Sequence, residues 1–289
     1  MAFEELMGTT TRLLASAQAL SAVMARLRLA ELGEVGDPAV RAQLDRVADV
    51  LGVREELDQL EPQERAILLA FSRSYLNQAV DLVEDPVRKG AWTHTDPMLL
   101  QAQGSASAVV ARLFVEAGLG GGTVRILDVG TGVAGLAIAF CTTFPESTVV
   151  GIDPWKPSLA IARENVVAAG LDSRITLIAT TIEEFEDPDG FDLVWLPAFF
   201  VPETVLDRAI GRTFELTRPG GQIVVGVPYG TENDPLGAAV DDLFTVRGGG
   251  SALDSATAIA RLERAGFADV HEFERTWDVP LRLVVGRRH

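Results

Sequence analysis

The chain has 289 residues, 47% of them hydrophobic, which excludes a disordered protein and leaves room for one large domain or a domain with a smaller companion. Its formal net charge of −16 disfavours nucleic-acid backbones and anionic membranes as partners. The single cysteine, Cys141, excludes a disulfide framework and a zinc site. With the acidic start "MAFEEL" and no apolar run near the roughly 18 residues of a membrane span, this predicts a cytoplasmic protein without a metal.

The first ninety residues have a helical period and carry no strand signal. Apolar side chains recur at steps of three and four at Leu13, Ala17, Leu20, Met24 and Leu27, and again from Leu68 to Leu82. Between them, residues 37–52 form a shorter predicted helix with Asp37 as its cap, Pro38 at its first position and Gly52 past its end. Two interpretations stay open: a helical cap or lid packed on a core domain, or a subunit interface for a homodimer, which the near-heptad spacing of the first helix suggests.

A further helix is predicted from Asp96 and Pro97 to about Gly118, where "GLGGG" forms a hinge. We therefore expect a helical region over residues 1–118 and a second domain over 119–289.

From Thr123 onward, strand and helix patterns alternate. Strands are predicted at 124–129, 148–153, 175–180, 191–197 and 222–228, with helices at 134–144, 157–170, 202–217 and 255–267. Such alternation indicates an α/β fold with a doubly wound, Rossmann-like parallel sheet. Two closing strands, at 269–277 and 281–288, are joined by only three residues, which suits an antiparallel hairpin and leaves one strand running against the others.

The segment "RILDVGTGVAG" raises the question of the cofactor. Gly130, Gly132 and Gly135 have the G-x-G-x-x-G spacing, and Asp153 ends an apolar run eighteen residues later, as in NAD-binding folds. Asp153 suits the ribose hydroxyls of either NAD or S-adenosylmethionine. Asp128 separates the two, because a carboxylate repels a pyrophosphate but attracts an ammonium and a sulfonium. S-adenosylmethionine carries both cations.

Four segments in order, "ILDVGTGVAG", "VVGIDPWKPSLAIARENV", "FDLVWLP" and "TRPGGQIVVGVP", resemble the motifs of class I S-adenosylmethionine-dependent methyltransferases. The resemblance covers about Thr123 to Gly286. It implies a seven-stranded sheet with its final strand inserted antiparallel. It also implies the following cofactor contacts: Asp128, Gly130 and Gly132 at the methionine end, Asp153 at the ribose, and Pro154 and Trp155 at the adenine. Where the family often has an acid for the adenine amino group this chain has Thr181, so Thr181 and Ile182 are expected to contact the adenine.

The acceptor side is less specific. "AWTHTDP" lies where the helical region meets the cofactor domain, so Trp92 is expected to face the acceptor and His94 is the candidate general base, the alternative being a hydrogen-bonded surface loop. Gln101 and Gln103 are expected to reach the carboxylate of the cofactor. The remaining expected residues are Leu196, which lines the crevice beside the cofactor, and Phe199, Phe200 and Tyr229, which line the acceptor space.

These residues favour a small, largely apolar acceptor over DNA or RNA. The predicted function is therefore methyl transfer from S-adenosylmethionine, with S-adenosylhomocysteine as product, to a small molecule of specialised metabolism. Two alternatives remain: an NAD(P)-dependent oxidoreductase, and a cofactor-binding module without transfer activity. The atom that receives the methyl group is not written in the sequence.

Overall fold

The computed structural model describes residues 3–33, 36–119, 124–228, 234–277, 279 and 281–289. By its internal contacts the chain divides into two compact units, residues 1–83 and residues 84–289. Each unit is described by itself.

The first unit is helical, as its periodicity predicts. Its helices are α1 (Phe3–Glu31), α2 (Pro38–Leu51), α3 (Arg54–Gln59) and α4 (Pro62–Glu84). Met24 and Leu27 of α1 pack with Ala48 and Leu57 into a small core. The predicted cap of α2 is confirmed, because the Asp37 carboxylate accepts a 2.7 Å hydrogen bond from the backbone N–H of Ala39, and Gly52 ends the helix with φ of 70°.

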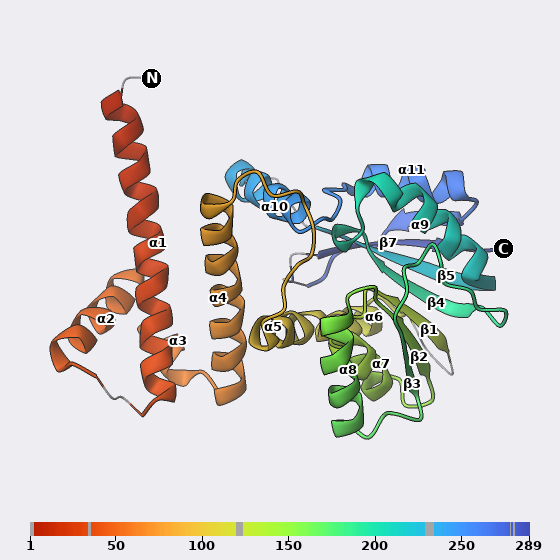
Figure 1. Ribbon diagram of the computed structural model, residues 1–289, viewed down its shortest axis with the longest axis horizontal. Helices are drawn as coiled ribbons and strands as arrows, with labels where there is room; N and C mark the ends of the chain where they lie inside the picture. The colour runs from red at the N-terminus through yellow and green to blue at the C-terminus, as the bar shows by residue number, and fades with distance from the viewer. Residues whose placement is uncertain (1–2, 34–35, 120–123, 229–233, 278, 280) are drawn as a thin grey trace. The chain divides into compact units, whose positions relative to one another are not determined.

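The second unit is built on a seven-stranded sheet with the order β3-β2-β1-β4-β5-β7-β6 (Figure 1). Its strands are β1 (Arg125–Val129), β2 (Thr148–Ile152), β3 (Ile175–Ile178), β4 (Phe191–Pro197), β5 (Thr217–Pro228), β6 (Ala268–Glu272) and β7 (Leu281–Arg287). The first five run parallel, whereas β7 pairs antiparallel with both β5 and β6. The doubly wound sheet and the closing hairpin predicted from the sequence are both confirmed.

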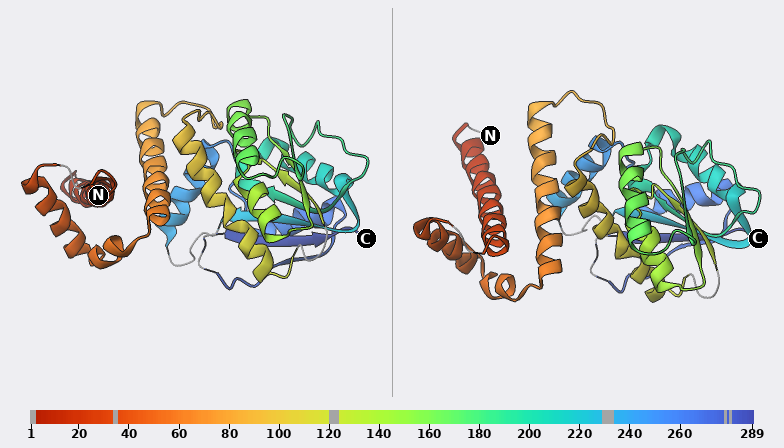
Figure 2. Two further views of the ribbon diagram at one scale, coloured as in Figure 1. Left: turned by 90° about the horizontal axis from the view of Figure 1, so that it is seen from below. Right: turned by 60° about the horizontal axis from the view of Figure 1, so that its bottom comes forward.

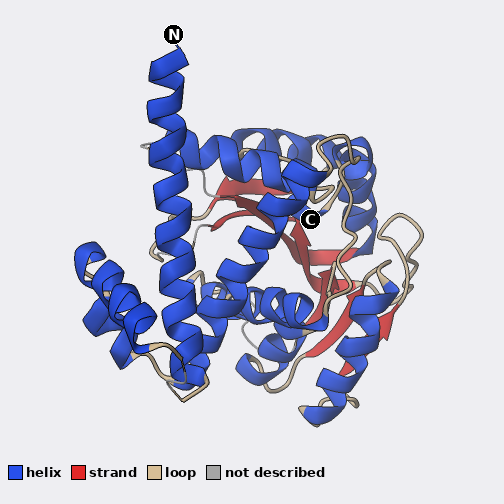
Figure 3. Ribbon diagram, turned by 60° about the vertical axis from the view of Figure 1, so that its left-hand side comes forward, coloured by secondary structure: helices blue, strands red, loops and turns tan. Residues whose placement is uncertain are grey.

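Helices cover the two faces of the sheet (Figures 1 and 2). One layer holds α5 (Pro97–Ala108), α6 (Val110–Glu116), α7 (Gly135–Thr143) and α8 (Lys156–Ala168), and the other holds α9 (Glu203–Leu216) and α11 (Ser255–Ala265). Figure 3 shows the strands between helices. Successive residues of β1 enter different cores, with Ile126 in the first and Leu127 in the second. A strand buried on both sides explains why the strand segments read as continuous apolar runs.

The contact-based units meet between residues 83 and 84, and the boundary expected after residue 118 stays a prediction. Helix α5 belongs to the second unit because it approaches the start of α7 very closely: a Cβ on Gly135 would lie 2.1 Å from the carbonyl oxygen of Gly104. Two glycines therefore permit this packing. Gly135, the third glycine of the loop motif, serves this helix contact.

Three helices of the described chain begin at an Asp-Pro pair. Besides α2 and α5, helix α10 (Pro235–Arg247) starts after Asp234, whose carboxylate accepts a 2.9 Å hydrogen bond from the N–H of Gly237. The sequence analysis assigned no helix to this segment or to α3, although the same Asp-Pro signal stands at α10.

Two helices in the described part of the chain are long and apolar enough, by length and composition alone, to cross a membrane: α1 and the continuous stretch Pro97–Glu116. The sequence analysis expected no apolar run near the roughly 18 residues of a membrane span, and this finding corrects that expectation. In Pro97–Glu116, Val110, Leu113 and Phe114 are buried in the core beneath the sheet, as in the core helix of a globular domain.

Candidate functional site

The loop after β1 is tied to the end of β2. The backbone N–H groups of Gly130 and Thr131 both donate to the carbonyl oxygen of Ile152, at 2.8 and 3.1 Å. Gly130 and Gly132 have φ of 71° and 56°, a left-handed conformation that glycine adopts without strain. The predicted glycine loop therefore lies directly over the carboxyl end of the neighbouring strand, where ligands bind in open α/β sheets.

Asp153 follows β2 and holds this loop in place. One carboxylate oxygen accepts from the N–H of Gly132 at 2.9 Å, and the other accepts from the N–H of Trp155 at 2.7 Å. Burial raises the pKa of Asp153, and the two backbone hydrogen bonds oppose that rise. Since a carboxylate oxygen has two lone pairs, each oxygen can still accept one hydroxyl, as a ribose would require.

Asp128 is 2% exposed and lies near the end of β1. Its carboxylate accepts a 2.7 Å hydrogen bond from the hydroxyl of Thr131. Burial raises its pKa to about 7, the nearby charge of Asp153 adds to the rise, and the bond from Thr131 opposes it. Among the described residues no cationic side chain forms an ion pair with Asp128. A ligand cation is the partner that this buried acid would favour.

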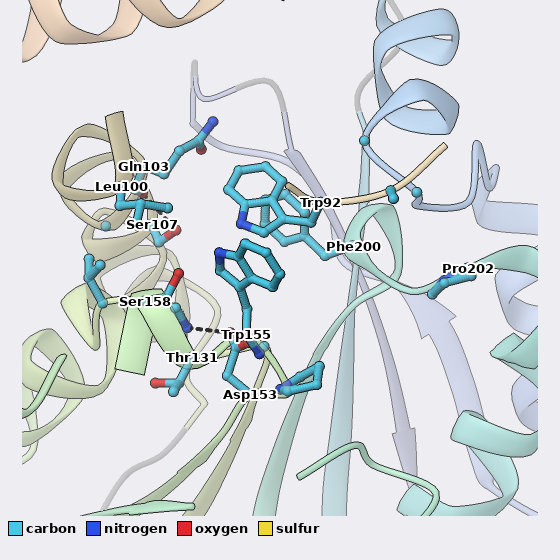
Figure 4. A pocket seen from close by; sticks show the side chains of 18 of the residues that line it. Trp92, Leu100, Gln103, Ser107, Thr131, Asp153, Trp155, Ser158, Phe200 and Pro202 are labelled. Carbon is cyan, nitrogen blue, oxygen red and sulfur yellow. Dashed lines mark hydrogen bonds between the residues drawn. The ribbon is translucent and has the colours of Figure 1, made fainter. Parts of the chain in front are cut away.

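The main cavity of the second unit, about 380 Å³ in volume, opens beside these residues (Figure 4). Half of the residues that the sequence analysis assigned to the cofactor or the acceptor side line it: Trp92, Gln103, Gly130, Gly132, Asp153, Pro154, Trp155 and Phe200. The tertiary structure thus brings together segments separated by more than a hundred positions of the chain.

A second cavity of about 160 Å³ adjoins the main one, since Gln103, Gly130, Thr131 and Phe200 line both. Asp128 lines the second cavity, and so do Trp195, Pro197 and Phe199 at the end of β4. Asp128 therefore lines the second cavity and Asp153 lines the main one, and Gly130 of the glycine loop lines both.

Aromatic side chains form part of the walls of both cavities. The ring of Trp92 meets that of His94 edge-on at 4.9 Å and that of Phe200 at 5.6 Å, and Phe199 meets Phe200 at 4.7 Å. Figure 4 shows Trp92, Trp155 and Phe200 pointing into the same space. The indole N–H of Trp155 donates to the backbone carbonyl of His94 at 2.7 Å.

Several predicted residues lie elsewhere. Leu196 is fully buried in the core and faces away from both cavities, because alternate residues of β4 point to opposite sides of the sheet. Ile182 also packs in that core, and neither it nor Thr181 lines a cavity. Gln101 exchanges hydrogen bonds with Asn165 instead of reaching the cavity. The cofactor contacts expected of these residues stay predictions.

The last two predicted residues are His94 and Tyr229. His94 is partly buried, and its imidazole is not among the groups that line either cavity, so its role as a base stays a prediction. Tyr229 lies outside the described residues.

The sequence analysis missed part of the wall of the main cavity. Ser107 and Ser158 line it from α5 and α8, and Gly248 and Gly249 line it from the segment after α10. The run "RGGGS" at residues 247–251 is the signal that could have marked that segment, since consecutive glycines indicate close approach of backbones. Within the described ranges no group of three or more His, Cys, Asp or Glu side chains could hold a metal ion.

Comparison with known proteins shows which proteins the chain is similar to. Residues 126–221 match the family model described as "Methyltransferase domain". The demethylmenaquinone methyltransferase of Thermus thermophilus is 37% identical over 102 residues, which is 35% of this chain and 46% of that protein. The chain therefore matches less than half the length of this curated relative.

Two solved structures resemble the whole chain. One is an O-methyltransferase family protein from Burkholderia thailandensis, with a TM-score of 0.70 and 17% identity, covering 100% of this chain and 98% of that one. The other is CalO1, a methyltransferase of calicheamicin biosynthesis in its S-adenosylhomocysteine-bound form, with a TM-score of 0.70 and 15% identity, covering 100% of both chains. At these identities the likeness concerns the fold.

Proposed function

We propose, from the premise that this chain carries a class I methyltransferase domain with residues 126–221 in that family, that it transfers a methyl group from S-adenosylmethionine to an oxygen of a small molecule. The observation that carries the proposal is the buried carboxylate of Asp128, which faces the second cavity without a cationic partner among the described residues. S-adenosylmethionine would supply an activated methyl group and, at its methionine end, the missing cation.

The residues present fit this cofactor. Asp153 and Trp155 in the main cavity would hold the ribose and the adenine. Asp128, Gly130 and Gln103 in the second cavity would hold the methionine end. Asp153 keeps a free lone pair on each oxygen for hydroxyl donors, and the glycine loop has no side chain to obstruct the ligand. The same acid beside a pyrophosphate would be repulsive, which disfavours NAD(P).

The acceptor space supports a planar, mostly apolar molecule. Trp92, Phe199 and Phe200 form a contiguous group of rings, and such rings pack on a flat acceptor by edge and face contacts. The formal charge of −16 does not favour a polyanionic acceptor. Oxygen as the receiving atom is supported by the likeness to the O-methyltransferase family protein of Burkholderia thailandensis. A place in natural-product tailoring is supported by the likeness to CalO1 of calicheamicin biosynthesis. The role of the protein in transfer is to align the acceptor oxygen with the methyl carbon and to exclude water.

His94 is proposed as the base that takes the proton of an acceptor hydroxyl. Its ring contacts Trp92, which lines the main cavity, so the imidazole lies one side chain away from the acceptor space. Catalytic hydrogen bonds often tighten only when the substrate is bound.

We also propose that two copies associate through the first unit. Helix α1 exposes a row of large apolar side chains over residues 3–20: Phe3, Leu6, Met7, Leu13, Leu14 and Leu20. A row of this size on a helix is a typical association surface. We propose that a second copy of the chain binds this row in the cytoplasm. Binding of α1 to a membrane is the alternative outcome of the test.

Isothermal calorimetry tests the cofactor proposal. We expect micromolar binding of S-adenosylmethionine and S-adenosylhomocysteine and none of NADH. Binding of NADH with neither sulfur ligand would overturn the proposal. Incubation of the protein and S-adenosylmethionine with a panel of hydroxylated aromatic compounds should then release S-adenosylhomocysteine, and mass spectrometry of the product identifies the methylated atom.

A further inference from the structure

One wall of the main cavity includes an irregular stretch at residues 85–94, which we call the strap. Gly90, Ala91 and Trp92 of the strap line the cavity. The strap has no helix or strand of its own, so its position depends on contacts with other elements.

The C-terminal end of α10 holds the first part of the strap. The guanidinium of Arg247, 7% exposed, donates to the backbone carbonyls of Asp85 and Arg88, at 2.5 and 3.1 Å. The N–H of Ala91 donates to the carbonyl of Arg247 at 3.2 Å. Three hydrogen bonds thus connect one buried residue to this half of the strap.

Glycines make the contact between the strap and the following segment close. Gly249 has φ of 86°, and a Cβ there would lie 2.9 Å from the Cα of Ala91. A Cβ on Gly90 would lie 2.2 Å from the carbonyl oxygen of Val246. The two backbones therefore touch, and no side chain can be inserted between them without moving the strap.

The last part of the strap is held differently, by a side chain that also lines the cavity. The indole N–H of Trp155 donates to the carbonyl oxygen of His94 at 2.7 Å, while its ring lines the main cavity. The backbone N–H of Trp155 in turn donates to Asp153 at 2.7 Å. Trp155 therefore connects the carboxylate proposed to bind the ribose with the strap.

We propose that Trp155 is a positioning residue whose indole N–H latches the strap over the cavity, and that this hydrogen bond must break each time the cofactor enters or leaves. The inference rests on the proposed function, because it concerns the same cavity. The latch acts through the backbone of His94 and so sets the position of Trp92, which contacts both His94 and Phe200.

The latch predicts rate constants of ligand binding that differ from those predicted for an ordinary ligand contact. The bond exists with the strap closed, whether the cavity is empty or filled, and is lost only during opening. Removing the N–H therefore lowers the barrier to entry and the barrier to exit together, and leaves the equilibrium affinity nearly unchanged. A side chain that merely contacts the ligand would raise only the exit rate and would weaken the affinity.

Trp155→Phe is the informative variant, because it keeps an aromatic ring in the cavity and removes the N–H. Trp277→Phe is the matched control: Trp277 donates an equivalent bond, 2.8 Å, to the carbonyl of Leu281, but lines neither cavity. The probe is S-adenosylhomocysteine, followed by stopped-flow tryptophan fluorescence. For Trp155→Phe we expect the association rate constant to rise about fivefold, the factor that corresponds to one net hydrogen bond. The dissociation rate constant should rise at least as much, because the smaller ring can also weaken the contact with the adenine. The control should match the wild type.

A ligand-free measurement accompanies it. In Trp155→Phe the backbone amides of the strap should exchange with deuterium several times faster than in the wild type, and in Trp277→Phe they should not. Gly249→Ala tests the other attachment: the added Cβ displaces Ala91, so this variant too should speed both rate constants, and unchanged rate constants in it would count against a strap that opens.

The outcomes separate the two proposals. A wild-type protein that binds no S-adenosylhomocysteine overturns the proposed function and the latch with it. Binding by the wild type with unchanged rate constants and amide exchange in Trp155→Phe overturns the latch alone. A raised Kd with an unchanged association rate constant also overturns it, and makes Trp155 a simple ligand contact.

Discussion

The hydroxyl of Thr131 donates a 2.7 Å hydrogen bond to the carboxylate of Asp128, and both residues are buried at the edge of the second cavity. A neutral hydroxyl stabilises an ionised acid only partly, so the carboxylate keeps a pKa raised to about 7. This acid is therefore poised to respond both to pH and to a cationic ligand, and the first two predictions concern it.

The first prediction concerns stability. The pKa of Asp128 is about 7 in the folded protein against 3.8 for the ordinary side chain, so between these values the folded state holds a proton that the unfolded state has lost. Stability should therefore fall as pH rises from about 4 to about 7. Asp128→Asn removes the contribution of this acid, and the raised pKa of Asp153 leaves part of the decline in place. Relative to the wild type, the free energy of unfolding of the variant should grow by about 2 to 4 kcal/mol from pH 4 to pH 8, measured by urea unfolding.

Asp187 provides the control. The guanidinium of Arg125 lowers its pKa, so its stabilising contribution is lost as pH falls below about 4, the opposite direction. Asp187→Asn should leave the decline between pH 4 and pH 7 in place. If Asp128→Asn leaves the decline undiminished as well, Asp128 is not one of its sources.

The second prediction concerns cofactor affinity. A cationic ligand favours the ionised form of Asp128, so binding of S-adenosylmethionine should strengthen as pH rises from 6 to 8 and should release a proton. In Asp128→Asn the affinity at pH 8 should fall at least about tenfold, as for a lost charged interaction, and the pH dependence should disappear. Calorimetry in buffers of different ionisation enthalpy measures both. An affinity that is independent of pH in the wild type would remove Asp128 from the cofactor site.

The third prediction separates two tasks of Asp153. Asp153→Ala loses the ribose acceptors and also the hydrogen bonds to Gly132 and Trp155, so S-adenosylmethionine binding should weaken at least about tenfold. Asp153→Asn keeps one acceptor oxygen and should weaken it less. Equal affinities of the wild type and Asp153→Ala in calorimetry would exclude Asp153 from the site.

The fourth prediction concerns His94. Trp155 binds the backbone carbonyl of His94, so His94→Ala removes the imidazole and leaves that hydrogen bond in place. If the imidazole is the base, turnover with a hydroxylated acceptor should fall about 100-fold to 10,000-fold while cofactor binding is retained. Full turnover of the variant would reject the assignment.

The fifth prediction concerns association. We expect analytical ultracentrifugation to give twice the chain mass of 30.9 kDa. The double variant Leu13→Glu, Leu20→Glu should give a single chain, because it puts charges in the exposed apolar row of α1. Ala15→Glu, which places a charge at an exposed position on the side of that helix away from Leu13 and Leu20, is the control. Flotation of the wild type with lipid vesicles, in place of a dimer, would contradict the proposal.

The sequence predicted much of the second unit because its signals are local. The order of strands and helices follows from apolar runs of a few residues, and the antiparallel end of the sheet follows from the short connection between the last two strands. Asp128 stood out because its charge beside a glycine loop selects one kind of ligand. Asp37 and Asp96 marked helix starts through the hydrogen bonds that their side chains make within three residues.

What the sequence could not determine depends on contacts between distant segments. Leu196 and Phe199 lie three positions apart, yet the twist from strand to the short turn at 198–200 buries the first in the core and leaves the second in a cavity. Gly249 lines the cavity only because the strap packs against it, and Trp155 meets His94 across 61 positions of the chain. Local chemistry determined the elements and the charge of the site; which side chains meet across it was decided by tertiary packing, since that depends on backbone approaches that no short window of sequence contains.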